Sequence, residues 1–276
     1  MEQRTAAGET DGRDPAITTE NLTKSYGKNL AVDRLSILVP AGSIFGLLGP
    51  NGAGKSTIIK MLTTILPPTS GGAMVAGHSI TADPVGVRRS MGYVSQMLSA
   101  DGALTGYENL LLFARIYGVP AGERRRRIEE SLAFMGLSEV ARKVVSSYSG
   151  GMIRRLEIAQ TILHHPSVIF LDEPTIGLDP VARRHVWDKL RELRESYHTT
   201  ILLTTHDMEE ADELCDRIAI LQSGKLAVVG APEELKRMAG TDSMDQVFIH
   251  FAVETGEQTA PYSEIVQTRR TAQRLG

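Results

Sequence analysis

The stretch GPNGAGKST, at residues 49–57, matches the pattern G-x-x-x-x-G-K-[ST] at each of its fixed positions. It follows SIFGLLG at 43–49, an apolar run typical of a buried strand, and it opens KSTIIKML, a run typical of a helix. Glycines let a loop in this setting turn tightly enough for its backbone N–H groups to converge on phosphate oxygens. The stretch therefore predicts a phosphate-binding loop in an α/β fold; a plain glycine-rich turn is the alternative.

Two side chains of this loop suit a nucleoside triphosphate and its metal ion. Lys55 places a positive charge on the β and γ phosphates, and the Ser56 hydroxyl is placed for Mg²⁺. The candidate nucleotide-binding residues of the loop are Gly49, Pro50, Asn51, Gly52, Ala53, Gly54, Lys55, Ser56 and Thr57.

A pair of carboxylates follows another apolar run, SVIFLDEP at 167–174. Asp172 and Glu173 come at the C-terminal end of this predicted strand, which is where ligands lie in open α/β sheets. We expect Asp172 to hold Mg²⁺, directly or through water, and Glu173 to polarise the attacking water. The alternative is a carboxylate that caps a turn before Pro174.

A second phosphate cradle appears in SYSGGMIRRLEIAQTIL, at 147–163. Its apolar residues recur at i, i+4, i+7 and i+11, which predicts one face of an amphipathic helix. Ser149 is a favoured helix cap, and the glycines Gly150 and Gly151 leave the first backbone N–H groups open to an anion. One chain therefore carries two candidate cradles, far apart in the sequence.

Strands alternate with helices along much of the chain. Residues 16–40 alternate loosely, as short antiparallel strands do, whereas 167–172 and 199–206 resemble buried strands that precede helices. Residues 97–165 are almost wholly helical, and 217–230 predict a hairpin that turns at Ser223 and Gly224. We expect an α/β fold with a mostly parallel sheet, an N-terminal antiparallel β subdomain and an inserted helical subdomain.

Composition narrows the possible partners. The chain has 276 residues and a net charge of −3, so the total charge offers no argument for nucleic acid. Its single cysteine, Cys215, excludes an internal disulfide, fits a reducing compartment and suits a buried position in the helix that starts near Asp207. The run RRRR at 124–127 lies among glutamates and predicts a solvated helix face rather than a binding patch.

The two ends of the sequence are polar. Residues 1–15 look like a loose tail, neither a signal peptide nor an anchor, and the longest apolar runs fall short of the roughly 18 residues that span a bilayer. Residues 254–276 end in TRRTAQRLG, which predicts a disordered tail, with contact to a membrane or partner as the alternative. We expect the folded domain to cover 16–235 and a partly disordered extension to cover 236–276.

The motifs follow one another along the chain in a fixed order: phosphate loop, SGG cap, FLDEP, GLDP at 177–180 and then His206. This order closely resembles the ATP-binding-cassette (ABC) ATPases over about residues 16–235. The resemblance implies a P-loop ATPase core in which two copies meet head to tail around two ATP molecules. Each ATP then lies on the phosphate loop of one copy and under the serine-glycine cap of the other, so each of the two cradles in a chain forms half of a different ATP site.

The resemblance also implies roles for four further residues. Tyr26, in KSYG, matches the aromatic residue that stacks on adenine, and Gln96, in MGYVSQ, matches the glutamine that contacts Mg²⁺ and the attacking water. Asp179 matches an aspartate that crosses the dimer interface, and it also suits a helix N-cap before Pro180. His206 matches the histidine that contacts the γ-phosphate. The alternatives are a core tyrosine for Tyr26 and an exposed loop residue for Gln96.

One motif departs from the family pattern. The usual leucine-serine-glycine-glycine-glutamine is here YSGGM at 148–152, and Met152 cannot make the glutamine's contact. YSGGM, RRLEIA, GLDP and TTHDMEEADELCDRIAIL most resemble the daunorubicin-resistance-type branch. That branch implies a homodimeric ATPase that is a separate chain, acts at the cytoplasmic face of the membrane and powers an export permease.

The permease is expected to dock beside Gln96. LTGYENLLLFARIYG at 104–118 matches the usual docking region, with Leu104, Leu110 and Phe113 as apolar candidates or as local core. The rivals are a soluble cassette ATPase of translation or DNA repair and a regulatory module that binds ATP without turnover. A single cassette without sustained heptads argues against the first, and Glu173 with His206 argues against the second.

Overall fold

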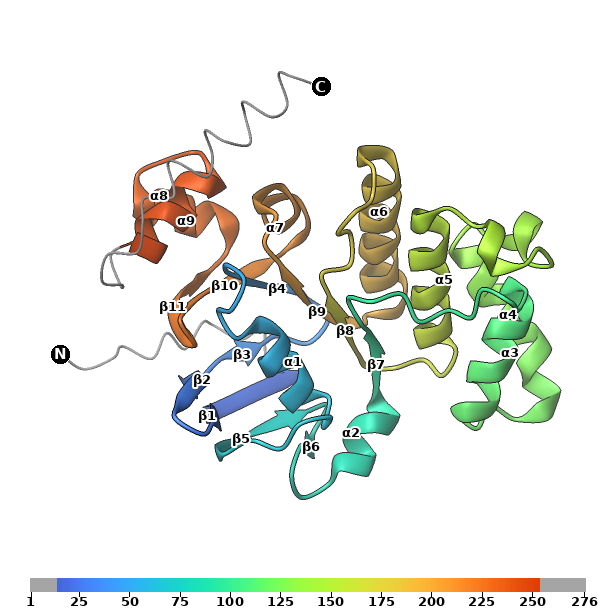
Figure 1. The fold of residues 1–276 in the computed structure, drawn as a ribbon, viewed down its shortest axis with the longest axis horizontal. Helices are drawn as coiled ribbons and strands as arrows, with labels where there is room; N and C mark the ends of the chain where they lie inside the picture. Colours follow the sequence, from blue (N-terminus) through green and yellow to red (C-terminus); the bar gives the residue numbers. More distant parts are fainter. Residues whose placement is uncertain (1–13, 254–276) are drawn as a thin grey trace.

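The computed structural model describes residues 14–253, which form two sheets with helices around them (Figure 1). Residues 1–13 and 254–276, which carry most of the expected N-terminal tail and the end of the expected C-terminal extension, lie outside the described part.

The larger sheet has six strands in the order β11-β10-β4-β9-β8-β7, parallel except for the β10–β11 hairpin. Its strands are β4(Ile44–Leu48), β7(Met91–Val94), β8(Val168–Asp172), β9(Thr200–Thr205), β10(Arg217–Gln222) and β11(Lys225–Gly230). β4, β8 and β9 are buried along their whole length, as expected of parallel strands covered on both faces. The parallel core and the hairpin turn at Ser223–Gly224 are confirmed.

The second sheet is antiparallel and lies at the lower left of Figure 1. It contains β1(Ile17–Tyr26), β2(Asn29–Leu35), β3(Leu38–Val39), β5(Ser70–Val75) and β6(His78–Ser79). α1(Lys55–Leu62) shares one apolar cluster with strands of both sheets, so it packs between them. The expected N-terminal β subdomain is present, and the short α2(Pro84–Ser90) leads from it back to β7.

Helices gather at the opposite end of the molecule (Figure 1). They are α3(Gly106–Ile116), α4(Ala121–Phe134) and α5(Gly150–Ile162), with single turns η1(Ser138–Val140) and η2(Val145–Ser147) between them. The arginine run lies on α4, where Arg125 and Arg126 pair with glutamates one turn away at 2.9 Å and stay well exposed. The predicted solvated face is confirmed for these two residues, whereas Arg124 and Arg127 are half-buried and donate to the backbone carbonyls of Val119 and Leu163, at 2.7 and 3.2 Å.

Four helices follow β8: α6(Pro180–Tyr197), α7(Met208–Leu214), α8(Pro232–Ala239) and α9(Met244–Val253). The boundary expected at 235 falls inside α8, and Val247 and Phe248 of α9 are buried in the main apolar cluster. The packed core therefore continues to α9, because apolar residues of this short helix cover the β10 side of the sheet. Cys215 is buried where α7 ends, and burial raises the pKa of its thiol well above the usual range.

The core explains which residues meet at the site. On β4, Ile44 and Leu48 face the cluster of α5, α6 and α7, whereas Phe45 and Leu47 face the cluster of α1 and the antiparallel sheet. The parallel strands all end at one edge, where loops carry polar side chains. No helix between residues 14 and 253 combines the length and the apolar character that crossing a bilayer requires.

Candidate active site

The phosphate loop joins β4 to α1 and packs tightly against its neighbours. Gly54, the N-cap of α1, has φ 99°, and a Cβ there would lie 2.5 Å from the Ala31 carbonyl oxygen. A Cβ on Gly49 would lie 2.7 Å from the Leu221 carbonyl oxygen. Both ends of the loop therefore require glycine. Gly54 is required by its positive φ and its close contact, and Gly49 by its close contact alone.

Lys55 is buried beneath this loop. Its Nζ donates to the carbonyl oxygens of Gly49 and Pro50, at 2.6 and 3.2 Å, and lies 3.9 Å from Glu173 Oε1. Burial lowers the pKa of the lysine, while the charges of Glu173 and Asp172 act in the opposite direction. The loop thus surrounds a cation at the position where the sequence predicts phosphate.

Asp172 ends β8 and meets two hydroxyl groups. Thr204 Oγ1, from β9, donates to Asp172 Oδ1 at 2.6 Å, and Ser56 Oγ, from α1, donates to the same oxygen at 3.2 Å. Hydroxyl and carboxylate oxygens are ligands that Mg²⁺ accepts, and proteins hold this ion with one or two side chains plus substrate phosphates. Ser56 and Asp172 fit that donor set. Residues 14–253 contain no group of three or more histidine, cysteine, aspartate or glutamate side chains that could hold a metal ion.

Glu173 is the centre of the site. Its carboxylate lies 3.2 Å from His206 Nδ1 and 3.9 Å from Lys55 Nζ, and it accepts a hydrogen bond of 3.4 Å from Gln96 Nε2. The side chain is only 10% exposed. Lys55 at the start of α1, Gln96 after β7 and His206 after β9 therefore converge on one carboxylate, and all three are among the predicted site residues.

The backbone of Glu173 is strained and held in place. Its φ is 51°, a left-handed conformation that costs a residue of this kind on the order of 1 kcal/mol or more. Its N–H donates to the carbonyl and the hydroxyl oxygens of Thr204, at 3.2 and 3.0 Å. Thr204 thus supports both carboxylates. Thr204 was not among the predicted residues, although the threonines that end this apolar strand were a signal in the sequence.

The backbone of Gln96 is held in place by a side chain of α5. Arg154 donates to the carbonyl oxygens of Ser95 and Gln96, at 2.8 and 3.1 Å, and pairs with Glu157 at 3.1 Å. Glu157 in turn accepts from the Ser99 hydroxyl at 3.1 Å. Burial lowers the pKa of Arg154, whereas the charges of Glu157 and Asp172 raise it. These anchoring residues were not predicted.

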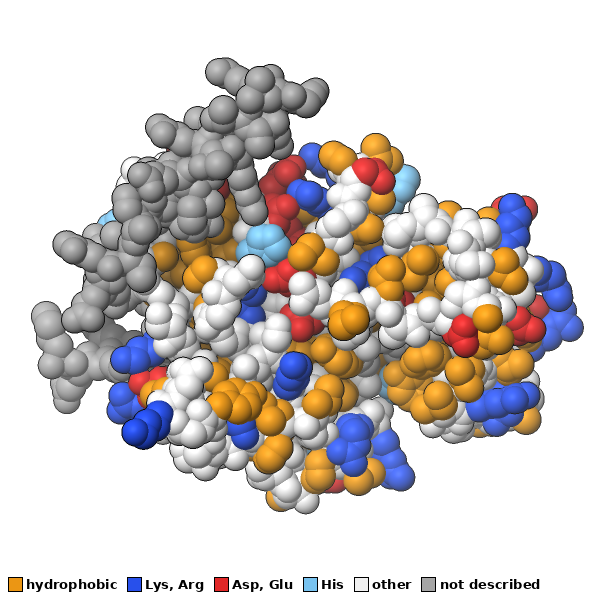
Figure 2. All heavy atoms as spheres, viewed as in Figure 1, with side chains coloured by type: hydrophobic (Ala, Val, Ile, Leu, Met, Phe, Trp, Pro, Cys, Tyr) orange, Lys and Arg blue, Asp and Glu red, His pale blue; other side chains and the backbone are white. Residues whose placement is uncertain are grey.

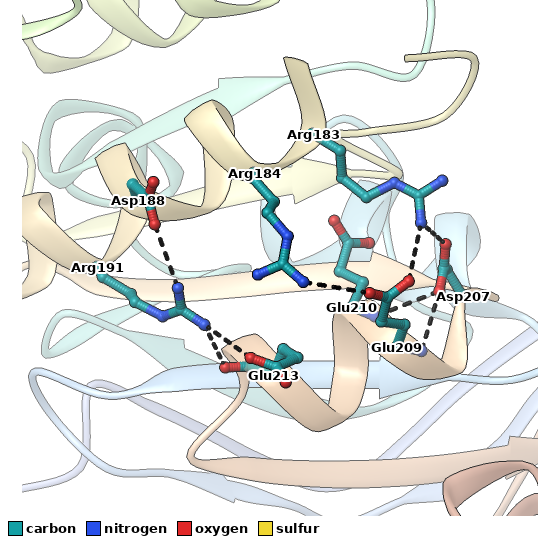
Figure 3. Close-up of polar contacts among 8 residues, drawn as sticks. All are labelled: Arg183, Arg184, Asp188, Arg191, Asp207, Glu209, Glu210 and Glu213. Carbon is teal, nitrogen blue, oxygen red and sulfur yellow. Dashed lines mark hydrogen bonds and ion pairs between the residues drawn. The ribbon is translucent and has the colours of Figure 1, made fainter. Parts of the chain in front are cut away.

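His206 lies between β9 and α7. Asp207, the N-cap of α7, accepts from the backbone N–H groups of Glu209 and Glu210 with Oδ1, and Arg183 of α6 donates to its Oδ2 at 2.6 Å (Figure 3). A small cleft beside His206 is lined by Glu173, Gly177 and Arg183 among others. The loop of His206 is therefore fastened to α6.

Glu210 adds a buried link in the same place. Its Oε1 accepts from Thr175 Oγ1 at 2.7 Å and from Trp187 Nε1 at 3.0 Å. Burial raises the pKa of this carboxyl, and the hydrogen bonds from Thr205, Thr175 and Trp187 lower it by less. The chain just after Glu173, helix α6 and helix α7 are thus joined through one carboxylate.

The remaining predicted residues lie apart from Glu173. Ser149 caps α5 and Asp179 caps α6, the latter accepting from the N–H groups of Val181 and Ala182 at 3.0 and 2.9 Å. The two caps are neighbours, because a Cβ on Gly151 would lie 2.8 Å from that of Ala182 and one on Gly150 would contact Leu178 at 3.5 Å. The expected N-cap role of Asp179 is confirmed.

Tyr26 ends β1 and is 49% exposed, which argues against the alternative of a core tyrosine. The only cation near its ring among residues 14–253 is Lys24, whose Nζ lies 5.5 Å from the ring centre. Within the same residues, none of the hydrogen bonds or ion pairs of Tyr26, Ser149 or Asp179 reaches Glu173. An open ring and two adjacent helix caps are thus available to a ligand or to another copy.

The fold and the loop over Lys55 define a nucleotide-binding P-loop protein, and the ABC transporter family model matches residues 32–176. The chain belongs to the ABC transporter family and is an ABC ATPase, as the order of motifs predicted.

Relatives of known role agree. The daunorubicin/doxorubicin resistance ATP-binding protein DrrA of Streptomyces peucetius is 46% identical over 227 residues, covering 82% of this chain and 68% of the relative. The Nod factor export ATP-binding protein I of Ralstonia nicotianae is 43% identical over 224 residues, 81% of this chain and 70% of the relative. A solved dimeric ATP-binding cassette, in a post-hydrolysis state with ADP and phosphate, superposes with a TM-score of 0.70 at 26% identity, covering 78% of this chain and 98% of that one. None of these supports the translation, repair or regulatory alternatives.

Proposed function

We propose that the chain is the ATP-hydrolysing subunit of an exporter, works as a homodimer with Mg²⁺, and powers a separate permease at the cytoplasmic face of the membrane. The observation that carries the proposal is the convergence of Lys55, Gln96 and His206 on Glu173, beside the Ser56–Asp172 pair. The relatives named as drug-resistance and Nod factor export ATP-binding proteins support the export role.

Each residue then has one task. The loop N–H groups and Lys55 bind the β and γ phosphates, and Ser56, Asp172 and Gln96 hold Mg²⁺, which when bound neutralises charge that develops on the phosphates. Glu173 accepts a hydrogen bond from the attacking water and polarises it, and Gln96 orients that water. His206, 40% exposed and turned toward Glu173, contacts the γ-phosphate.

The second cradle serves the other copy. Ser149 and Asp179 cap adjacent helices outside their own Glu173 cluster, and the superposed relative is dimeric. In a head-to-tail dimer, Ser149 with Gly150 and Gly151 binds the γ-phosphate of the partner's ATP, and Asp179 crosses the interface. Tyr26 stacks on the adenine held by its own phosphate loop. No step in this scheme uses nucleic acid.

The permease contacts apolar residues beside Gln96. Met97 and Leu98 are 81% and 53% exposed, and Leu112 and Ile116 of α3 are 45% and 66% exposed. Figure 2 shows hydrophobic side chains gathered on the helical end of the molecule. Exposed apolar side chains in one region mark an interaction site. For Leu110 the alternative of local core holds, because it lies on the inner face of α3 and is fully buried.

The docking surface has a direct test. Leu112→Glu with Ile116→Glu should release the chain from membranes that contain its permease and leave basal ATP hydrolysis unchanged, because neither residue touches the site. Met74→Glu, at an exposed position of β5, is the matched control and should stay bound. Retention of the double variant on those membranes would contradict this surface.

The chemistry is tested by two substitutions. Glu173→Gln keeps the shape of the site but loses the carboxylate, so turnover should fall by roughly 10²- to 10⁴-fold while ATP still binds. Lys55→Ala should abolish ATP binding, because the loop loses its buried cation. ATP should hold the Glu173→Gln protein as a dimer on size exclusion; a monomer with ATP bound would contradict the homodimer. Glu129→Gln, at an exposed position of α4, is the control.

Sharing of the sites is tested by mixing. Ser149→Arg should stop hydrolysis without weakening the binding of one nucleotide, since Ser149 serves the partner's ATP. A dimer of one Ser149→Arg copy and one Lys55→Ala copy has one site with both defects and one with neither. Partial activity should therefore return, and a proven heterodimer without activity would argue against independent shared sites.

A further inference from the structure

Arg183 connects a helix cap to the residue after His206. It lies four positions after Asp179, in the first turns of α6, and its Nη1 is 2.6 Å from Asp207 Oδ2 and 3.7 Å from Glu209 Oε2. Figure 3 shows the guanidinium turned toward the start of α7. The two ends of this connection are the cap proposed to meet the partner and the loop of the histidine proposed to meet the γ-phosphate.

Asp207 divides its two oxygens between two helices. Oδ1 accepts from the first N–H groups of α7, and Oδ2 pairs with Arg183. The Asp207 N–H also donates to Thr205 Oγ1 at 2.9 Å. His206 thus lies between Thr205, which ends β9 of the central sheet, and Asp207, which is held by Arg183 of α6.

A second contact keeps α6 and α7 in one arrangement. Trp187, one turn beyond Arg183, donates to the buried Glu210, and the Arg183 guanidinium lies 5.9 Å from the Trp187 ring. Thr175 donates to the same carboxylate from the chain after Glu173. A small displacement at the start of α6 therefore displaces the surroundings of His206 as well.

We propose that Arg183 is a positioning residue that transmits engagement of Asp179 by the partner copy to His206 of its own site. The proposal rests on the homodimer and on the histidine role of the proposed function. Docking of the partner sets the first turn of α6, Arg183 sets Asp207, and His206 reaches the γ-phosphate only in that arrangement. Hydrolysis then requires a correctly seated dimer.

The same helix provides matched controls. Arg184 lies 3.8 Å from Glu209, and Arg191 lies 3.5 Å from Glu213 while donating to its backbone carbonyl at 2.7 Å (Figure 3). Both arginines join α6 to α7, but neither contacts Asp207. If a general bond between the two helices were what matters, these variants would behave like Arg183 variants.

The first experiment measures Mg²⁺-dependent ATP hydrolysis by the full chain. Arg183→Met replaces the guanidinium with an unbranched apolar side chain, and Asp207→Asn keeps the Oδ1 acceptor that caps α7 while removing the charged partner. Each should lower kcat by roughly tenfold to a hundredfold with KM unchanged, because misplacement of a catalytic group acts on the chemical step. The double variant should be no slower than either single one, since both remove the same interaction. Arg183→Lys should recover part of the loss.

The second experiment uses Trp187, the single tryptophan of the chain, as a probe of this contact. In the Glu173→Gln protein, ATP should change the Trp187 emission as the dimer forms, and Arg183→Met should remove that change while Arg184→Met and Arg191→Met keep it. A wild-type kcat for Arg183→Met, equal losses in the Arg184 or Arg191 variants, or no ATP-dependent emission change would each overturn the proposal. If Glu173→Gln itself kept turnover, the proposed function would fail instead.

Discussion

Helices α5 and α6 are built alike and placed side by side. Each begins at a polar cap, Ser149 or Asp179, and each carries an arginine shortly afterwards that holds a loop reaching Glu173. Arg154 of α5 holds the backbone of Gln96, and Arg183 of α6 holds Asp207, next to His206. Both helices therefore join a surface proposed to face the partner to a residue that contacts the Glu173 carboxylate.

The two arginines differ in their surroundings. The side chains of Arg154 and Glu157 are 3% and 2% exposed, whereas those of Arg183 and Asp207 are 25% and 30% exposed. Water screens the second pair and not the first, so the first is costly to disturb and the second can adjust. Gln96 is accordingly held by the rigid structure of the helical subdomain, and His206 by a contact that partner docking can alter.

The largest expected effect comes from breaking the buried pair. Arg154→Met leaves Glu157 as an unpaired buried charge and removes two donors from the Ser95–Gln96 backbone. The free energy of unfolding should fall by about 3–5 kcal/mol. Urea denaturation measures this, with Arg125→Met, at a well exposed position of α4, as a control.

A second substitution separates stability from positioning. Adding Glu157→Gln to Arg154→Met removes the unpaired charge and keeps an oxygen for Ser99, so much of the lost stability should return. The hydrolysis rate should stay low, because the Gln96 backbone still lacks its donors. A double variant with restored stability and full activity would show that Arg154 serves the fold alone.

The fold and the centre of the site followed from local signals. A glycine-rich loop between a strand and a helix, and two carboxylates at the end of a buried strand, predicted a site for phosphate and Mg²⁺ at the edge of the sheet where ligands lie. The family resemblance added Gln96 and His206, and the structure brings them within 3.4 and 3.2 Å of Glu173.

The supporting residues were not predictable in the same way. Arg154 reaches backbone 59 positions away, and Arg183 reaches a carboxylate 24 positions away. A charged residue in an amphipathic helix normally faces solvent, and only the packing of α5 inside the molecule shows that Arg154 does not. The position of α9 is similar: its ten residues carry too weak a pattern to reveal that they cover the main core.

The helix caps should give intermediate effects that again distinguish the two helices. Asp179 accepts from two N–H groups and adds a negative charge at a helix N-terminus, whereas Ser149 accepts from one, at 3.3 Å. Asp179→Ala should cost about 1–2 kcal/mol of unfolding free energy and Ser149→Ala about 0.5–1 kcal/mol. Asp179→Asn, which keeps the cap, should be close to wild type in urea denaturation; equal costs for the two alanine variants would remove this distinction.

The smallest stability effect should come from Arg183, although its effect on turnover is large. The Arg183–Asp207 pair is partly exposed, so Arg183→Met should lower the unfolding free energy by less than about 1 kcal/mol. The difference from wild type should shrink further as salt is raised from low ionic strength, because ions screen a pair that water reaches. The loss from Arg154→Met should not depend on salt, since its pair is sealed from solvent. Denaturation of both variants across a salt series measures the contrast directly. If Arg183→Met proved as costly and as salt-independent as Arg154→Met, both arginines would be structural anchors, and His206 would be held as rigidly as Gln96.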